Sequence, residues 1–428
     1  MKSLLNRLLS GRFGRNIAFM TGATVIGHGL FLVASPLLTR VFDPAAFALL
    51  SILMTIQALA LAAVSGKIEW SVLTAKNRGR AAALVKASLV ITIAVTALLT
   101  IGMVWHADYL ARTLGLGADI KFLLLILPVS ILAASVQMIL QSWCVITGEL
   151  RPIALSKLIQ SALFVGIALA GGVITGAGAW LATGFTLSHV LAGFVLIALL
   201  VEVFKIFSDQ NWSYILAVTC NSRKEIAASL GSSILHRLAF YLPFLMIWAL
   251  YDETILGWFA FVFRMGTAPL SFLSGALAKS FWAEATDLAK SDPPALRRLF
   301  LRTLQVLGLA GAAFAIICLT APFYFGFIFG EKWAGAGGIM AAMTPMLFSL
   351  LVFSSTNHLI VYRRQHWQLW CDALSIILFG GVFWVMASVG YSIVLVLSVS
   401  SFAFLISYSL RFYLHLLANK RWTEENQK

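Results

Sequence analysis

Two apolar stretches joined by a short polar turn run from Ile226 to Trp282: IAASLGSSILHRLAFYLPFLMIWALYDETILGWFAFVFRMGTAPLSFLSGALAKSFW. Each is long enough to cross a hydrocarbon layer about 30 Å thick as a helix. If the first enters from the cytoplasmic side, a rise of about 1.5 Å per residue places Arg237 roughly 16 Å deep, and Arg264 returns to a similar depth. A guanidinium there costs at least ~2.5 to 3.5 kcal/mol when it faces lipid, so both side chains should line a hydrated cavity that attracts anions.

The alternative is that each arginine pairs with a carboxylate and simply holds helices together. Between Ile226 and Trp282 the only acidic residues are Asp252 and Glu253, which fall in the turn. In the rest of the chain, Asp372 is the only carboxylate that we place inside a span, near its cytoplasmic end. The sequence therefore favours a ligand site over a structural ion pair.

The composition is that of a polytopic membrane protein. Of 428 residues, 60% are hydrophobic and only 11% are charged, with a mean hydropathy of +0.92. The net charge of +14 indicates basic cytoplasmic loops and not nucleic-acid binding. The four cysteines are scattered without a CxxC pair, so neither a disulfide nor a metal site is expected. The first apolar segment follows a basic start but has no cleavage site, and we interpret it as a retained span.

Apolar runs of about twenty residues predict twelve spans in an all-α integral membrane protein. They lie near 16–39, 45–65, 82–105, 120–146, 153–175, 177–201, 226–250, 254–281, 299–321, 336–361, 367–387 and 391–417. With the N-terminus inside, 25 of the 31 Lys and Arg residues fall on the cytoplasmic side, four on the outer side and two near the midplane. This asymmetry predicts that both termini are cytoplasmic.

An internal repeat divides the spans into two six-helix lobes, 1–224 and 225–428. A shift of about 209 residues pairs Ile17 with Ile226 and Asp43 with Asp252, among five identities without a gap. Both halves begin on the same side of the membrane, and a parallel duplication of this kind places a substrate path between two lobes. The shift also sets His28 opposite Arg237.

Several motifs are absent. The chain has no phosphate-binding G-x-x-x-x-G-K-[ST] loop, no H-E-x-x-H and no G-x-S-x-G, so we expect neither an enzyme nor a cofactor. Energy must then come from an ion gradient or from substrate depletion.

The stretch from Trp212 to Val218 predicts an interfacial helix. Most polar residues inside spans, such as Gln57 and His189, are expected to hydrogen-bond between helices. Lys157, near a cytoplasmic span end, either reaches the headgroups or collects diphosphates at an entrance.

The first hairpin resembles a known family. It reads SPLLTRVFDPAAF at residues 35–47, followed by GKIEW at 66–70, and the second half adds LGWFA at 256–260 and FGEKWAGAG at 329–337. This order of motifs is similar to the Wzx-type polysaccharide flippases, within the multidrug, oligosaccharidyl-lipid and polysaccharide exporter superfamily. The chain departs by having Ala48 where the family usually has Gly, whereas the repeat partner Gly257 keeps it.

The resemblance implies a V-shaped pair of lobes in the bacterial inner membrane that alternates between inward and outward openings. Its cargo would be an oligosaccharide on undecaprenyl diphosphate, moved from the cytoplasmic to the outer leaflet during lipopolysaccharide, O-antigen or exopolysaccharide biosynthesis. The predicted substrate-binding residues are Arg237, Arg264, His28, Arg40 and Lys157. His236 and Asp372 are candidates for coupling to H+ or Na+. Membrane lipids and the glycan polymerase or export machinery are the expected partners.

Two other functions compete with this interpretation. A drug or small-solute exporter of the same superfamily would favour organic cations and needs midplane carboxylates, whereas the predicted cavity is basic. A membrane glycan polymerase or ligase would need a sizeable outer loop with catalytic residues, and the outer loops here are short.

Overall fold

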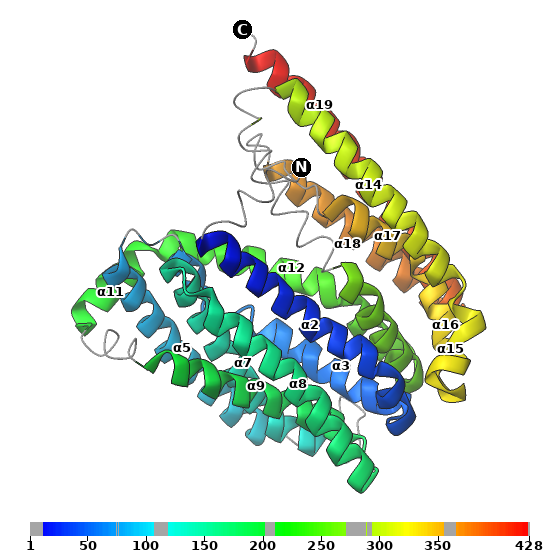
Figure 1. The fold of residues 1–428 in the computed structure, drawn as a ribbon, viewed down its shortest axis with the longest axis horizontal. Coiled ribbons are helices and arrows are strands. Elements are labelled where there is room, and N and C mark those ends of the chain that lie inside the picture. The colour runs from blue at the N-terminus through cyan, green and yellow to red at the C-terminus, as the bar shows by residue number, and fades with distance from the viewer. Residues whose placement is uncertain are drawn as a thin grey trace. The chain divides into compact units, whose positions relative to one another are not determined.

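The computed structural model describes residues 12–73, 75, 77–106, 119–201, 210–270, 288, 293–354 and 365–426, which fold into helices joined by turns (Figure 1). No strand occurs in these ranges, so the predicted all-α class is confirmed for them. The chain forms two compact units, Met1–Tyr241 and Leu242–Lys428. The lobe boundary predicted after residue 224 stays a prediction, and each unit is described separately.

The first unit contains eight complete described helices and the start of a ninth. They are α2 (Arg12–Val41), α3 (Pro44–Ala60), α4 (Ile68–Leu73), α5 (Arg78–Trp105), α7 (Asp119–Thr147), α8 (Leu150–Thr175), α9 (Ala179–Leu199), α11 (Trp212–Asn221) and α12 (Arg223–Leu250). Helix α8 packs most extensively against α2 and α9. Small residues permit this packing, because a Cβ at Gly184 would come within 3.0 Å of the Ala168 backbone nitrogen.

The second predicted span, 45–65, differs from the structure. Helix α3 ends at Ala60, a series of turns follows to Lys67, and the short helix α4 then begins at Ile68. Ile68 and Val72 of α4 belong to a buried apolar cluster with Leu84 of α5 and Trp143 of α7. The segment after residue 65 is therefore packed inside the first unit, where we had predicted a cytoplasmic loop.

A helix, α11, is present where the interfacial helix was predicted, and its position at the membrane surface stays a prediction. Its Ile215 and Val218 are buried in the same apolar cluster, whereas Trp212 and Leu216 are exposed. The ammonium of Lys86 on α5 lies 5.1 Å from the centre of the Trp212 ring and donates to the Gln210 carbonyl at 3.1 Å. Lys86 thus attaches the start of α11 to α5.

The second unit starts within α12 and continues with a helical stretch at 253–270. Then come α14 (Pro293–Leu319), α15 (Ala321–Phe329), the 3-10 turn η1 (Glu331–Trp333), α16 (Ala334–Ala342), α17 (Thr344–Ser354), α18 (Gln365–Ser388) and α19 (Ile393–Asn426). The single span predicted at 336–361 contains a 53° bend between the segments 331–342 and 344–353. Helix α15 occupies a region that we had predicted as an outer loop.

The helix breaks occur at equivalent points of the proposed repeat. Asp43 precedes α3, and Asp252 precedes the helix at 253–270, as the shift of 209 residues requires. Only Asp252 caps its helix with the side chain, because its Oδ1 accepts from the Ile255 amide at 2.8 Å, whereas Asp43 makes no such capping bond.

The FGEKWAGAG motif acts as a packing element in the second unit. The Trp333 side chain is fully buried, with its ring 4.8 Å from that of Phe261, and Phe329 lies 5.0 Å from the same Phe261 ring. Trp258 donates from Nε1 to the Lys332 carbonyl at 2.9 Å. These contacts hold the helix at 253–270 against α15 and η1.

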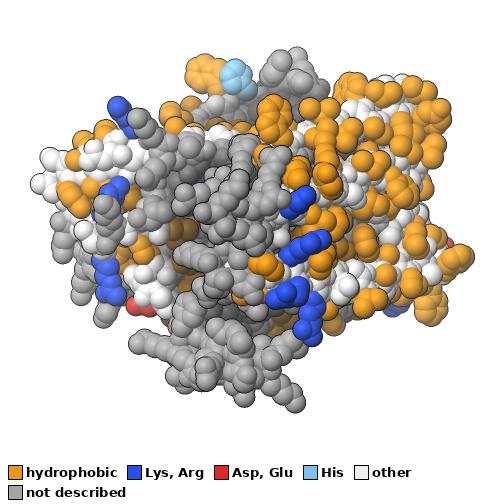
Figure 2. All heavy atoms as spheres, turned by 90° about the horizontal axis from the view of Figure 1, so that it is seen from above, with side chains coloured by type: hydrophobic (Ala, Val, Ile, Leu, Met, Phe, Trp, Pro, Cys, Tyr) orange, Lys and Arg blue, Asp and Glu red, His pale blue; other side chains and the backbone are white. Residues whose placement is uncertain are grey.

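Large apolar side chains cover the exterior of the helices. On α14, Leu309 is 75% exposed, and Figure 2 shows apolar side chains spread over the second unit with Lys and Arg gathered near one border. Such exposure is costly in water and favourable in lipid. Six described helices are long and apolar enough to span a membrane, and the bent pair is a candidate for a seventh. The chain is thus a multi-pass membrane protein, whereas the count of twelve stays a prediction.

The start of α16 supplies a stability test with a matched control. A Cβ at Gly337 would lie 2.8 Å from the Ala321 carbonyl oxygen and from the Pro322 Cα, whereas one at Gly338 meets only Val394 at 3.4 Å. Gly337→Ala should destabilise the protein by about 1 to 3 kcal/mol. Gly338→Ala should be neutral or stabilising, because Ala favours helix by up to ~1 kcal/mol. Thermal unfolding of both variants in detergent measures the difference, and equal melting temperatures would contradict it.

Candidate functional site

A pocket of about 570 Å³ lies within the first unit. Three segments form it: the turn and helix α4 after residue 66, the last turns of α7, and the part of α12 that ends at Tyr241. Most of the surface that lines it is apolar, although charged and polar side chains also reach it, as is usual for a ligand site. The lining residues are Lys67, Glu69, Leu73, Met138, Gln141, Ser142, Val145, Ser233, Arg237, Phe240 and Tyr241.

The backbone at Gly66 and Lys67 is unusual. Gly66 has φ +62° and Lys67 has φ +57°, and Lys67 is the one non-glycine residue with positive φ in the described part of the chain. A left-handed conformation costs a residue with a Cβ about 1 to 2 kcal/mol. Such strain persists where surrounding contacts enforce it, often at functional sites. Here the two left-handed residues reverse the chain directly before α4.

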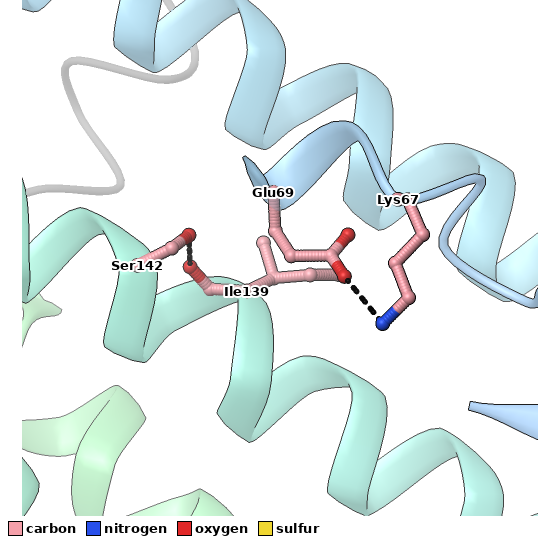
Figure 3. Close-up of polar contacts among 4 residues, drawn as sticks. All are labelled: Lys67, Glu69, Ile139 and Ser142. Carbon is pink, nitrogen blue, oxygen red and sulfur yellow. Dashed lines mark hydrogen bonds and ion pairs between the residues drawn. The ribbon is translucent and has the colours of Figure 1, made fainter. Parts of the chain in front are cut away.

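This reversal brings Lys67 against Glu69. The Lys67 Nζ lies 3.4 Å from the Glu69 Oε1, and both side chains are 3% exposed. Figure 3 shows the ammonium and the carboxylate pointing toward each other, with Ser142 of α7 nearby and bonded to the Ile139 carbonyl at 2.6 Å. Neither Glu69 oxygen makes a hydrogen bond within the described ranges. A buried carboxylate without hydrogen bonds is costly, so this group is poised for another partner.

Arg237 contributes a second cation to the pocket. Its side chain is half-buried, and its guanidinium lies close enough to repel the Lys67 ammonium. With Lys67 and Arg237 charged and Glu69 ionised, these three groups carry a net charge of about +1. Arg237 thus lines a pocket, and its role in binding a substrate stays a prediction. No carboxylate was predicted beside Arg237 from the sequence, whereas Glu69 of the short helix α4 lines the same pocket.

Two other predicted binding residues lie where α2 crosses α8. A Cβ at Gly27 would come within 2.6 Å of the Ser161 hydroxyl, so the helices meet closely there. His28 is adjacent to Gly27 and exposed, and Lys157, one turn before Ser161, is half-buried. Arg40 is exposed in the last turn of α2, about 18 Å along the helix from His28 at 1.5 Å per residue. Arg40 therefore does not join His28.

The remaining predicted residues lie elsewhere. Arg264 is half-buried in the helical stretch 253–270 of the second unit. The side chains of His236 in α12 and Asp372 in α18 lie outside the described residues. No group of three or more His, Cys, Asp and Glu side chains that could hold a metal occurs in the described ranges.

Four polar residues inside the predicted spans hydrogen-bond between helices, as expected for them. Gln57 of α3 donates to the Ser130 carbonyl of α7 at 3.0 Å. Gln137 of α7 donates to the His189 carbonyl of α9, and the Gln160 side chain of α8 lies 2.9 Å from the His189 Nε2. Gln141 instead lines the pocket.

A sequence profile of known proteins, described as "Polysaccharide biosynthesis protein", matches residues 13–281. The chain belongs to this family. Its fold is similar to that of solved membrane transporters. It resembles an inward-facing multidrug resistance MATE family transporter of the MOP superfamily, with 14% identity, 94% of this chain and 96% of the other covered, and a TM-score of 0.67. No curated protein matches by sequence.

A flippase has a similar fold. The lipid II flippase MurJ, in an inward closed conformation, gives a TM-score of 0.65 at 12% identity, with 96% of this chain and 89% of MurJ covered. These relatives are transporters and a flippase, and at such low identity the likeness establishes the fold.

Sequence reasoning did not include Lys67 and Glu69 among the site residues. The positive-inside pattern predicts Lys67 in a cytoplasmic segment, and Glu69 stands out only as part of the GKIEW motif. The signal was available in the neighbouring residues: six residues without charge, from Trp70 to Ala75, follow Glu69 before Lys76. Charges flanked by apolar sequence on both sides are candidates for burial, since a cytoplasmic loop would carry more polar residues.

The strain at Lys67 can be tested separately from its charge. Lys67→Gly and Lys67→Ala both remove the ammonium, but only glycine adopts φ +57° without cost. The Gly variant should be the more stable by about 1 kcal/mol. The melting temperatures of the two purified variants measure this difference in stability.

Lys86 provides the control, because there the Ala variant should be more stable than the Gly variant. It lies inside helix α5, so Lys86→Ala should be more stable than Lys86→Gly by about 1 kcal/mol. The same order at both sites would contradict the left-handed backbone at Lys67.

Proposed function

We propose that the protein is a flippase that carries oligosaccharide linked to undecaprenyl diphosphate from the cytoplasmic to the outer leaflet of the bacterial inner membrane. The observation that carries this proposal is the pocket of the first unit, where Lys67 and Arg237 outweigh one carboxylate inside an apolar membrane protein. An uncompensated cation in such surroundings is costly without a ligand, and a diphosphate supplies about two negative charges. Membership of a polysaccharide biosynthesis family supports a glycan as cargo.

The proposed topology places the pocket toward the side where the cargo is made. With twelve spans in two six-helix lobes and both termini cytoplasmic, α7 runs from the outer side to the cytoplasm. The pocket residues Met138, Gln141 and Val145 lie within about its last three turns. A headgroup entering from the cytoplasmic leaflet would then reach Lys67 and Arg237 early in the transport cycle.

The other predicted residues take related roles in this proposal. Arg264 in the second lobe, with His28, Lys157 and Arg40 in the first, would bind or guide the diphosphate while the lobes alternate between inward and outward openings. H+ or Na+ would drive the cycle through His236 and Asp372. The sugar would occupy the hydrated path, and the lipid tail would remain in the bilayer. O-antigen, lipopolysaccharide and exopolysaccharide synthesis all supply cargo of this chemistry.

The first experiment follows the cargo in cells. Leaflet-resolved detection of diphosphate-linked glycan lipids should show accumulation on the cytoplasmic side when the protein is absent, and mass spectrometry identifies the glycan. Normal delivery to the outer leaflet would overturn the proposal. Single units that accumulate on the outer side would indicate a polymerase or ligase, and increased drug sensitivity without a glycan defect would indicate a drug exporter.

The second experiment tests whether the Arg237 guanidinium binds the cargo. Arg237→Ala should reduce glycan export by tenfold or more, since hydrogen bonds to charged groups contribute about 1.5 to 3 kcal/mol. Arg237→Lys keeps the charge but loses bidentate geometry, so its export should be intermediate. Arg297→Ala removes an exposed cation of α14 and should leave export unchanged. Loss of the Arg237 variants from the membrane would instead indicate a structural role.

A further inference from the structure

We propose that Glu69 competes with the diphosphate of the cargo for Lys67 and thereby makes the pocket release what it binds. This inference rests on the proposed function and extends it from the cations to the carboxylate beside them. It assigns Glu69 the role of a positioning residue that acts on the cargo through Lys67.

The contact between the two charges is longer than a usual charge-assisted hydrogen bond. Charge-assisted N–H···O bonds usually measure about 2.7 to 2.9 Å, whereas Lys67 Nζ and Glu69 Oε1 are 3.4 Å apart. Both carboxylate oxygens are buried and lack a hydrogen bond in the described ranges. A pair that only stabilised the fold would be expected to be fully hydrogen-bonded. The Glu69 carboxylate has instead unused acceptors, and an ammonium has three donors that can serve a second anion.

Both partners line the pocket, so an entering anion reaches the same ammonium that Glu69 holds. The strained backbone at Lys67 fixes the base of the lysine side chain, while its four-carbon stem lets the ammonium move. A diphosphate carries about two negative charges, whereas the carboxylate carries one, and it therefore competes well for the ammonium.

The balance of charge explains why a competing carboxylate would be useful. Lys67, Arg237 and Glu69 sum to about +1, so a diphosphate with about two negative charges leaves the loaded pocket near −1. Without the Glu69 charge, the two cations would neutralise the diphosphate completely. A transport site must bind well enough to load and weakly enough to unload. Repulsion between Glu69 and the bound diphosphate weakens binding enough for the cargo to be released.

A purely structural role for Glu69 predicts the reverse effect on binding. If Glu69 only compensates the buried charge of Lys67, its removal leaves an unpaired ammonium, and the protein should lose stability or distort the pocket. Diphosphate binding would then weaken. The two roles are therefore separated by the sign of the change in affinity.

The test measures binding and transport on the same full-length variants. Geranyl diphosphate, a water-soluble isoprenyl diphosphate, is titrated calorimetrically into purified protein in lipid nanodiscs. Glu69→Gln should bind it on the order of tenfold more tightly than wild type, because one repelling charge is gone. Export of the glycan lipid by the same variant should fall several-fold, because release slows. Glu331→Gln, at an exposed carboxylate of the second unit, should change neither quantity.

Glu69→Asp keeps the test decisive if the glutamine variant does not fold. The shorter side chain retains the charge but withdraws it from Lys67, so its affinity should lie between wild type and Glu69→Gln. Wild-type or weaker binding by folded Glu69 variants would overturn the role of Glu69 and leave the flippase proposal intact. Failure of wild type to bind geranyl diphosphate, with export unaffected by Arg237→Ala, would instead overturn the diphosphate site itself.

Discussion

The cost of charge in an apolar surrounding governs this structure. Most of its helices expose leucine, isoleucine and phenylalanine to the exterior, so charged groups are tolerated where they meet one another or water. In the first unit, Lys67 and Glu69 are buried almost completely and face each other across 3.4 Å. The turn after α3, the strained backbone at Lys67 and the approach of α7 and α12 all serve to enclose these charges.

The fold could be predicted well where long apolar runs decide it. The starts and ends of α5, α8 and α9 lie within a few residues of the predicted spans, because unbroken hydrophobicity over about twenty residues leaves a membrane helix as the stable solution. Prediction failed at the break after Ala60 and at the 53° bend near Met343. Both interruptions lie inside apolar sequence, where hydropathy cannot distinguish a bent helix from a straight one.

The site was predicted in part for the same physical reason. Arg237 stands out because it interrupts an apolar run at its centre, and the structure places it in the pocket. Lys67 and Glu69 occur after a predicted span and look like loop residues. Their burial depends on α4 folding back into the unit through Gly66 and Lys67. The uncharged residues after Glu69 favour burial, but the backbone reversal depends on packing against α5 and α7 and cannot be predicted from the local sequence.

The family motifs differ in what they do in the structure. The tryptophan of FGEKWAGAG is fully buried against Phe261, so that motif holds helices of the second unit together. The charges of GKIEW instead line a pocket, with acceptors left without hydrogen bonds. Both are buried and both recur in a recognisable order, so sequence alone gives them equal weight. The two motifs differ in their chemistry. A buried aromatic ring is stabilised by packing alone. A buried ion pair with unused hydrogen-bond acceptors can still interact with a charged cargo.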